Sequence, residues 1–434
     1  MKKQEKEKNP WTPEDEKDHF PCTLEWWAVE CFFESLEDKK KWSLKTVLNE
    51  WFERKKDIGS IFNLTLFDEQ SGKHVTYFSR SDNKKLNTSK QRFEIQYEDS
   101  FIKGTYPNYE MFFNDKKNNI KLNLKYIAES FPHWISQDIT DGWLPMGFGF
   151  YRYGFIPKNQ ISGTIQLNDK KFNIQGKGYF EHVWGDFFYD NPLSNILGVK
   201  KTISLYLRLI KWWLNNRKFK IPNSITIGTD NNPFGYDWAW ALFENGWTIF
   251  YGNSLFWFMD GPAVGNLIFS KDGKRYIEFG DITFHYNKIE YSENYDFFYP
   301  TEFELTAKHG KEILNLKFKM TQKNREYVSK FPKSKYWLGL VICEAPGIVE
   351  GFYFDGNTKV KLTGVAKIEP QRQASIIGHN TLKIDFLKPP KGVGVTFDFE
   401  SHFLQKKLLL NIRFAPFPKI KFDFKKIDKA KIKK

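Results

Sequence analysis

Turn dipeptides that close β-hairpins recur along the chain, and they limit the available folds more than any other feature. Asn245-Gly246 and Asp355-Gly356 each stand between two runs that alternate polar and apolar residues. Asn-Gly and Asp-Gly favour tight hairpin turns because both positions tolerate positive φ. Repeated hairpins of this kind are typical of antiparallel all-β domains, either a sandwich or a barrel. The turn pattern alone does not distinguish between these two.

One segment, residues 195–215, breaks the strand pattern and predicts an amphipathic helix. At 100° per residue, its basic side chains share one arc and its apolar side chains fill the opposite side. Two alternatives stay open: the helix packs across a barrel mouth or between domains, or it lies on an anionic membrane surface. Nucleic acid is not an expected partner, because a Trp-rich face needs burial that a phosphate backbone does not supply. The membrane alternative assigns surface contacts to Lys200, Lys201, Arg208, Lys211, Trp212 and Trp213.

This helix also separates two sets of hairpins and therefore divides the chain. With 434 residues there is room for two or three domains. The expected parts are a charged N-terminal segment (1–18), a first β-domain (19–193), the helix insertion (194–222), a second β-domain (223–373) and a basic C-terminal extension (374–434). The extension contains strand-like runs such as "KLLLNIRF", so it is not a plain disordered tail before roughly Lys425.

Charge and cysteine content bear on where the protein works. The chain has 66 basic and 52 acidic residues, and this excess is typical of proteins that meet nucleic acid, anionic membranes or acidic ligands. It has no run long enough for a membrane span and no apolar stretch of a secretory signal. Its three cysteines form no CxxC pair, which fits a reduced compartment. We expect a cytoplasmic protein, with peripheral membrane attachment as an open alternative.

The stretch 176–192, "GKGYFEHVWGDFFYDNP", concentrates titratable side chains among aromatic ones. In a strand, His182, Trp184 and Asp186 share one face and Glu181 takes the other. A glycine bulge just before them would invert this pattern, so either Glu181 or His182 faces the interior. A buried carboxyl group is a usable acid near neutral pH, because desolvation favours its neutral form. The alternative is a structural His182 bonded to a backbone carbonyl, with Glu181 on a solvated face.

Other signatures of catalysis or metal binding are absent from the sequence. There is no GxSxG, HExxH or Walker A motif, and the eight histidines are scattered without ligand spacing. We therefore expect neither a metal nor a cofactor. Aromatic residues make up 18% of the chain, with 43 Phe and 15 Trp, which is more than one compact core needs. This excess indicates several cores or a cavity lined with rings.

Two stretches carry a resemblance to a known family. "HFPCTLEWWAVECFFE", from His19, and residues 147–186, ending in "GYFEHVWGD", resemble the opening strand and central signature of the hydroxyneurosporene synthase family. These lipocalin-like proteins include carotenoid 1,2-hydratases, kievitone hydratase and AttH-like proteins. Residues 236–251 and 347–370 resemble its second half more loosely. Glu181 stands where the family has Asp, and His182 and Trp184 match the signature; Tyr179 replaces a Trp, and Val183 and Ala28 also depart from it.

The resemblance implies two lipocalin-like β-barrels joined through their sides. It also implies the hydration of isolated prenyl double bonds, or cyclisation as in other members of this fold group, without a metal or redox cofactor. In this role Glu181 protonates an alkene or holds the adding water, His182 orients it, and Asp186 completes the catalytic set. The expected substrate-binding residues are Trp26, Trp27, Tyr151, Tyr153, Tyr179, Trp184, Trp238 and Trp240.

An apolar cavity for an isoprenoid would account for the aromatic excess, because ring faces stabilise a developing carbocation. Two other functions remain open at this point. One is a non-catalytic lipid-binding protein of the same fold. The other is an interaction protein whose basic helix and tail dock on a membrane or an acidic partner. Fold alone does not separate these alternatives from an enzyme.

Overall fold

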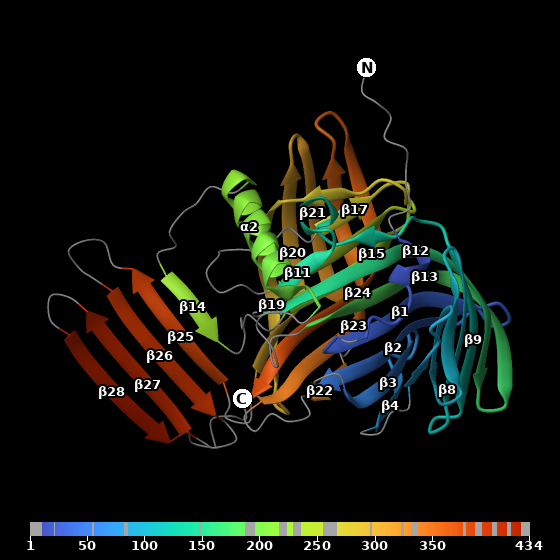
Figure 1. The fold of residues 1–434 in the computed structure, drawn as a ribbon, viewed down its shortest axis with the longest axis horizontal. Helices are drawn as coiled ribbons and strands as arrows, with labels where there is room; N and C mark the ends of the chain where they lie inside the picture. The colour runs from blue at the N-terminus through green and yellow to red at the C-terminus, as the bar shows by residue number, and fades with distance from the viewer. Residues whose placement is uncertain are drawn as a thin grey trace. The chain divides into compact units, whose positions relative to one another are not determined.

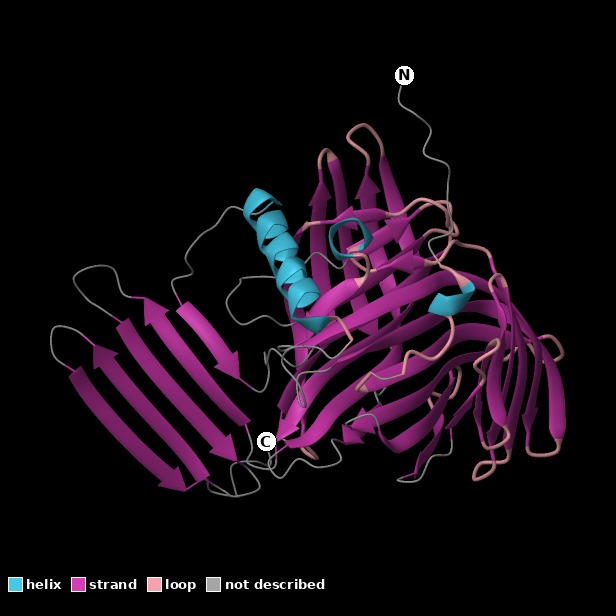
Figure 2. Cartoon of the chain, in the orientation of Figure 1, coloured by secondary structure: helices cyan, strands magenta, loops and turns pink. Residues whose placement is uncertain are grey.

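A computed structural model describes most of the chain between residues 11 and 426 (Figures 1 and 2). The stretches outside the described residues are 1–10, 21, 54–55, 82–85, 147–148, 187–195, 217–223, 229–235, 255–266, 296, 323–324, 331–336, 376–378, 387–392, 402–405, 415–417 and 427–434. Parts of the predicted N-terminal segment and of the stretch 176–192 therefore lie outside the described residues.

The described chain forms two compact units that do not follow chain order. Unit 1 comprises residues 1–212, 240–250 and 268–278, and unit 2 comprises residues 213–239, 251–267 and 279–434. One sheet is a nearly closed barrel and another is a half-barrel. The predicted all-β class with two lipocalin-like barrels and an inserted helix is confirmed.

The larger sheet lies entirely in unit 1 and has the strand order β4-β3-β2-β1-β13-β12-β9-β8-β7-β6-β5, with β10 and β11 paired to β12. Its strands are β1 (Leu24–Ser35), β2 (Lys41–Glu53), β3 (Lys56–Asp68), β4 (His74–Ser81), β5 (Leu86–Thr88), β6 (Phe93–Tyr97), β7 (Ser100–Thr105), β8 (Asn108–Asp115), β9 (Ile120–Ala128), β10 (His133–Trp134), β11 (Trp143–Met146), β12 (Gly149–Leu167) and β13 (Lys170–Asp186). The short helix α1 (Gln137–Thr140) precedes β11.

Strand β9 shows why these segments form a half-buried sheet. Ile120, Leu122 and Leu124 are buried, whereas Lys121 and Lys125 are exposed, so the apolar set occupies one face. This period-two pattern buries one face of each strand and leaves the other in water.

Strand β13 departs from that pattern in its second half. From Tyr179 to Asp186 every residue is buried, so both faces of the strand are covered. Its pairing with β1 runs without a register shift from Ile174 to Gly185, so no bulge inverts the strand there. A Cβ on Gly176 would lie 2.1 Å from the Phe32 carbonyl oxygen, so this glycine allows a close approach of β1.

Residues 11–20, which include the described part of the charged N-terminal segment, pack against unit 1. They contain a 3-10 turn, η1 (Pro13–Asp15). Trp11 lies 5.4 Å from Trp134 between ring centroids, and the buried Glu16 accepts hydrogen bonds from Thr105 and Tyr109. Burial raises the pKa of Glu16 despite these bonds. Trp11 and Glu16 thus belong to the core of unit 1, whereas Phe20 is 48% exposed.

Helix α2 (Gly198–Asn216) confirms the predicted amphipathic helix. Leu205 and Leu209 are buried, and Phe150 contacts Tyr206 with ring centroids 4.7 Å apart. A second apolar row remains exposed along the same helix. None of the helices among the described residues combines the length and apolar character that a bilayer crossing requires.

A ten-stranded sheet has the order β18-β17-β16-β15-β24-β23-β21-β20-β19, with β22 paired to β23. Its strands are β15 (Tyr236–Phe243), β16 (Thr248–Ser254), β17 (Leu267–Ser270), β18 (Ile277–Phe279), β19 (Asp281–Ser292), β20 (Phe297–His309), β21 (Glu312–Met320), β22 (Arg325–Lys330), β23 (Trp337–Phe354) and β24 (Lys359–Ser375). The predicted turns at Asn245-Gly246 and Asp355-Gly356 close the hairpins β15–β16 and β23–β24, and both glycines have positive φ.

The predicted C-terminal extension carries most of a five-stranded antiparallel sheet, shown in red and orange beside β14 in Figure 1. The strands are β14 (Ser224–Gly228), β25 (His379–Phe386), β26 (Val393–Ser401), β27 (Lys406–Phe414) and β28 (Pro418–Lys426). The strand-like runs noted in the sequence thus form a sheet, with basic residues such as Lys406 and Lys426 opposite each other at one end of the β27–β28 pair.

Unit 2 also buries an ion pair in its interior. Arg372 is 1% exposed, and its guanidinium donates to the Asp237 carboxylate at 2.8 Å. Tyr286 donates its hydroxyl proton to the same carboxylate. Burial lowers the pKa of Arg372, but the adjacent Asp237 charge outweighs it, and the pKa lies above its ordinary value.

Candidate functional site

The Glu181 carboxylate lies at the centre of a buried hydrogen-bonded cluster in unit 1. The side chain is only 7% exposed. Trp26 on β1 donates its indole N–H to Oε1 at 2.9 Å, and Tyr179 on β13 donates its hydroxyl to Oε2 at 2.8 Å. Tyr153 on β12 donates a second hydroxyl to Oε2. Three neighbouring strands thus hold one carboxylate.

Strand alternation explains how these side chains meet. Tyr179 and Glu181 are two residues apart on β13, so they share a face. Trp26 pairs with Val183 on one side of them, and Tyr153 also pairs with Val183 from the other strand. The pairing register of β1, β13 and β12 therefore brings residues distant in sequence to one point.

Aromatic rings surround this carboxylate. Phe155 stacks on Phe250 with centroids 4.6 Å apart and on Tyr179 at 5.8 Å. Trp240 lies 5.6 Å from Tyr179 and donates its indole N–H to the Pro157 carbonyl at 2.9 Å. All of these rings are buried. The phenol of Tyr179, which holds Glu181, thus lies among packed aromatic rings.

The hydrogen-bond partners of Glu181 are all neutral groups in the part of the chain that is described. No lysine, arginine or histidine within those ranges forms an ion pair with Glu181. Burial and the nearby carboxylate raise the pKa of Tyr153 and of Tyr179 well above the ordinary value. Both phenols consequently keep their protons at neutral pH. The two hydroxyl oxygens are 3.1 Å apart, beside the Glu181 oxygen to which both phenols donate.

His182 points to the opposite face of β13 and does not join this cluster. Its Nδ1 donates to the Asp15 carbonyl oxygen at 2.8 Å, and its Nε2 lies 2.7 Å from Glu25 Oε1. The ring stacks on Trp27 at 4.8 Å. The sequence left open which of the two neighbours faces inward; the structure buries both, on separate faces.

Sequence reasoning missed two partners of His182. Glu25 on β1 is fully buried, and His19 in the preceding segment places Nδ1 3.0 Å from the same Glu25 oxygen. Burial raises the pKa of Glu25, but the hydrogen bonds from His182 and His19 outweigh it and hold the pKa below its usual range. Both residues stand in the stretch "HFPCTLEWW", whose spacing gave no sign of a partner 157 residues away.

The structure separates the other predicted site residues. Trp184 stacks on His19 at 3.6 Å and therefore belongs with His182. Asp186 accepts a hydrogen bond from Thr23 Oγ1 at 3.0 Å, away from Glu181.

Tyr151 lies 6.3 Å from Tyr153 between ring centroids. Trp238 is buried and belongs to unit 2. Trp26, Tyr153, Tyr179 and Trp240 are thus the predicted residues that the structure gathers around Glu181.

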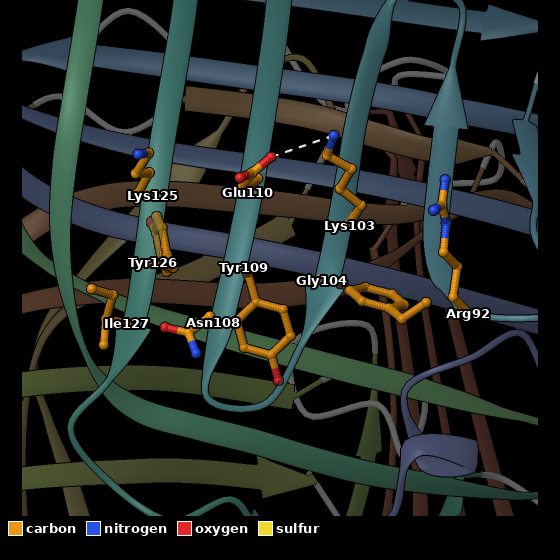
Figure 3. Close-up of a pocket in the computed structure, with 10 residues that line it drawn as sticks. Arg92, Lys103, Gly104, Asn108, Tyr109, Glu110, Lys125, Tyr126 and Ile127 are labelled. Carbon is orange, nitrogen blue, oxygen red and sulfur yellow. Dashed lines mark ion pairs between the residues drawn. The ribbon is translucent and has the colours of Figure 1, made fainter.

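A hollow of about 430 Å³ opens on strands β6–β9 of unit 1, and Figure 3 shows its lining. Lys103 and Glu110 form an ion pair there at 3.3 Å, and the ring of Tyr109 lies beside Asn108. The hollow is lined by none of the residues predicted for substrate binding. It is a mixed polar surface feature and does not extend the Glu181 cluster.

Solved structures of the same fold are known. An AttH-like protein of Nitrosomonas europaea is 14% identical, with a TM-score of 0.55 over 82% of this chain and 96% of its own. Kievitone hydratase of Nectria haematococca is 11% identical, with a TM-score of 0.51 over 80% of this chain and 88% of its own. No family model matches the sequence. No curated protein matches it either. These likenesses show the fold.

Removing one donor to Glu181 should cost stability. Tyr153→Phe leaves the buried carboxylate with one fewer hydrogen bond, and a bond to a charged group contributes about 1.5–3 kcal/mol. The free energy of unfolding, measured by urea titration, should fall by about that amount. Tyr276→Phe is the matched control, because its buried hydroxyl donates to the neutral Phe131 carbonyl and should cost about 0.5–1.5 kcal/mol. A smaller loss for Tyr153→Phe than for the control would contradict the cluster's geometry.

Proposed function

We propose that this protein is an enzyme that hydrates an isolated carbon–carbon double bond of a hydrophobic, isoprenoid-type lipid, with Glu181 as the proton-transfer group. One observation carries the proposal: a carboxylate enclosed by aromatic rings and held by three neutral donors, with no cationic partner in the described residues. A buried carboxylate is ordinarily held by a positive partner or, as at Glu16, by neutral donors in the core. Glu181 differs from Glu16 in that a tryptophan and two tyrosines hold it. A carboxylate left without a positive partner is suited to take up and release a proton.

The reaction that fits this arrangement is a balanced addition of water. The protonated Glu181 carboxyl gives its proton to one alkene carbon, and the π-electron pair forms the new C–H bond. The other carbon becomes a carbocation, and a water oxygen adds to it. The water then loses a proton, which returns to the Glu181 carboxylate directly or through Tyr153. No oxidant or reductant is required, because the elements of water are added without a change in electron count.

The ring-lined surroundings support an apolar substrate with a cationic transition state. Ring faces attract a positive charge within about 6 Å. Phe155, Phe250 and Trp240 supply such faces around Glu181. Kievitone hydratase, a hydratase by name, has the same fold, which agrees with the proposal. Isomerisation or cyclisation would use the same proton and cation if water were excluded from the site.

The experiment that tests this function begins with ligand identification. Lipid is extracted from the purified protein, separated and identified by mass spectrometry. The main apolar species is then incubated with fresh protein. The proposal expects its conversion to a product heavier by one water. A lipid that is retained but never converted would favour a non-catalytic lipid-binding protein.

Helix α2 supports a second role, attachment to an anionic membrane. Five apolar side chains along it are between 50% and 61% exposed: Val199, Ile203, Leu207, Ile210 and Leu214. They recur at helical spacing and form one stripe. Lys200 and Lys211 lie on the edge of that stripe, and Arg208 and Lys201 follow farther around the helix. A stripe of this kind, bordered by basic residues, is suited to the headgroup boundary of a bilayer.

The helix should bind vesicles through this stripe. Each Lys or Arg near an anionic surface contributes about 1 kcal/mol, screened within a Debye length. We expect co-sedimentation with anionic vesicles that weakens with salt and is lost in the double variant Ile203→Ser and Leu207→Ser. The matched control is the double variant Ile289→Ser and Ile348→Ser. These two residues are also exposed but lie on β19 and β23, so the control should still bind the vesicles. Equal binding by both variants would rule out α2 as the contact.

A further inference from the structure

We propose that His19, Glu25 and His182 form a binding site for a divalent transition-metal ion, best suited to Zn²⁺, which fastens the N-terminal segment to the first barrel. One nitrogen of each histidine and a Glu25 oxygen all lie within 4.8 Å of one another. Two imidazoles and one carboxylate are a donor set that zinc accepts in proteins. This site lies on the face of β13 opposite Glu181 and is separate from the proposed catalytic cluster.

Hydrogen-bond accounting requires a proton or a metal ion between His182 and Glu25. A carbonyl oxygen only accepts, so the bond from His182 to the Asp15 carbonyl places a proton on Nδ1. In the neutral ring, Nε2 then presents a lone pair to Glu25 Oε1 at 2.7 Å. A lone pair and a carboxylate oxygen repel each other at that distance unless a proton or a metal ion joins them. His19 donates its backbone N–H to both Glu25 oxygens, at 3.1 and 2.9 Å, and its Nδ1 lies 3.0 Å from Oε1. This second imidazole at the same oxygen completes a donor set that a metal ion uses, which favours the ion over a proton.

The surroundings resemble the outer shell of a built metal site. A ligating histidine usually donates its other ring N–H to a backbone carbonyl or carboxylate, as His182 does to Asp15. Trp27 and Trp184 stack on the two imidazoles and fix the ring planes. The Cys22 sulfur lies 3.7 Å from the second Glu25 oxygen.

Closing the donor set on an ion requires side-chain movement. Zn–N and Zn–O bonds near 2.1 Å place tetrahedral donors about 3.4 Å apart. The separations from Glu25 Oε1 are 2.7 Å to His182 and 3.0 Å to His19, so the first must widen by about 0.7 Å and the second by about 0.4 Å. Glu25 and His182 stand on the paired strands β1 and β13, so a side-chain torsion at one of them must supply the larger change. His19 precedes β1 outside any strand and keeps 22% side-chain exposure, so it can supply the smaller change and the entry path.

The test uses the full-length protein and zinc alone. Protein stripped with a chelator is titrated with Zn²⁺ against a chromophoric competitor, and Co²⁺ is then substituted to record the visible spectrum. We expect about one tight equivalent per chain, intense tetrahedral cobalt bands and a melting temperature that rises on metal addition. His19→Ala, at the most exposed ligand, should weaken zinc binding more than about 10-fold.

His133→Ala is the matched control, because His133 is also buried and pairs with a glutamate, Glu278, at 3.0 Å elsewhere in unit 1. It should retain full zinc affinity. The melting temperature of each apo variant shows that both are folded, so a lost site is not mistaken for an unfolded chain. Absence of a stoichiometric site, or equal zinc affinity in His19→Ala and the control, would overturn the proposal and leave a proton between His182 and Glu25.

Discussion

Replacing Glu181 by Gln should lower the hydration rate by about 10²–10⁴-fold, the usual contribution of a positioned general acid or base. Gln has nearly the same size, so the rings around it keep their packing. Its amide cannot donate a proton to an alkene or recover one from water. The assay is turnover of the apolar lipid recovered from the native protein, followed by mass spectrometry under single-turnover conditions.

Glu110→Gln is the matched control for this substitution. Glu110 is an exposed residue on β8 and pairs with Lys103 at 3.3 Å, far in the sheet order from β13. It should leave turnover unchanged. Glu181→Gln with unaltered turnover and an unaltered melting temperature would remove Glu181 from the mechanism and return the chain to a binding role.

The largest stability effect should follow from breaking the buried ion pair of unit 2. Asp237→Ala leaves the Arg372 guanidinium, 1% exposed, without its charged partner. Removing one partner of a buried pair typically costs about 3–5 kcal/mol, because the remaining charge stays uncompensated. The carbonyl oxygens of Tyr236 and Gln371 accept from the same guanidinium but carry no full charge.

The measurement for Asp237→Ala is the urea unfolding transition assigned to unit 2. Lys317→Met provides the comparison, since its ion pair with Glu302 is partly exposed, at 39% and 17% of the two side chains. Solvent screens such a pair, so its loss should cost much less. We expect the free energy of unfolding of unit 2 to fall clearly more in Asp237→Ala than in Lys317→Met. Similar midpoints for both would show that Arg372 finds solvent or another carboxylate when Asp237 is absent.

Local chemistry made the fold largely predictable from sequence. The turn at Asn245-Gly246 depends on residues that tolerate positive φ, and Gly246 has φ of 83° between β15 and β16. Helix α2 was predictable because its apolar period is local as well. Neither prediction required knowledge of which strands pair.

The site was harder to predict from sequence than the fold, because it depends on the pairing register of strands that are distant in sequence. Tyr153 and Trp26 meet Glu181 only because β12 and β1 flank β13 in a particular alignment. The second half of β13 is buried on both faces, so alternation could not separate Glu181 from His182. Glu25 and His19 form a cluster only because Glu25 also contacts His182, which lies on β13. A single sequence shows residue types and local periods, but not pairings of this kind.

The exposed stripe of α2 illustrates a similar limit. The sequence predicted one broad apolar side, yet the structure divides it into a buried row at Leu205 and Leu209 and an exposed row at Ile203 and Leu207. Helical periodicity shows which side chains share a face. It does not show how much of that face a neighbouring element covers.

Incorporation of solvent isotopes into the lipid distinguishes hydration from simple binding. The native protein and Glu181→Gln are incubated in water enriched in both deuterium and heavy oxygen, with the apolar lipid recovered from the native protein. If Glu181 drives hydration of a double bond, one solvent oxygen and one solvent hydrogen at the adjacent carbon enter the lipid with the native protein, and neither enters with the variant. A lipid that stays unlabelled with the native protein, or is labelled equally by both proteins, would contradict the account.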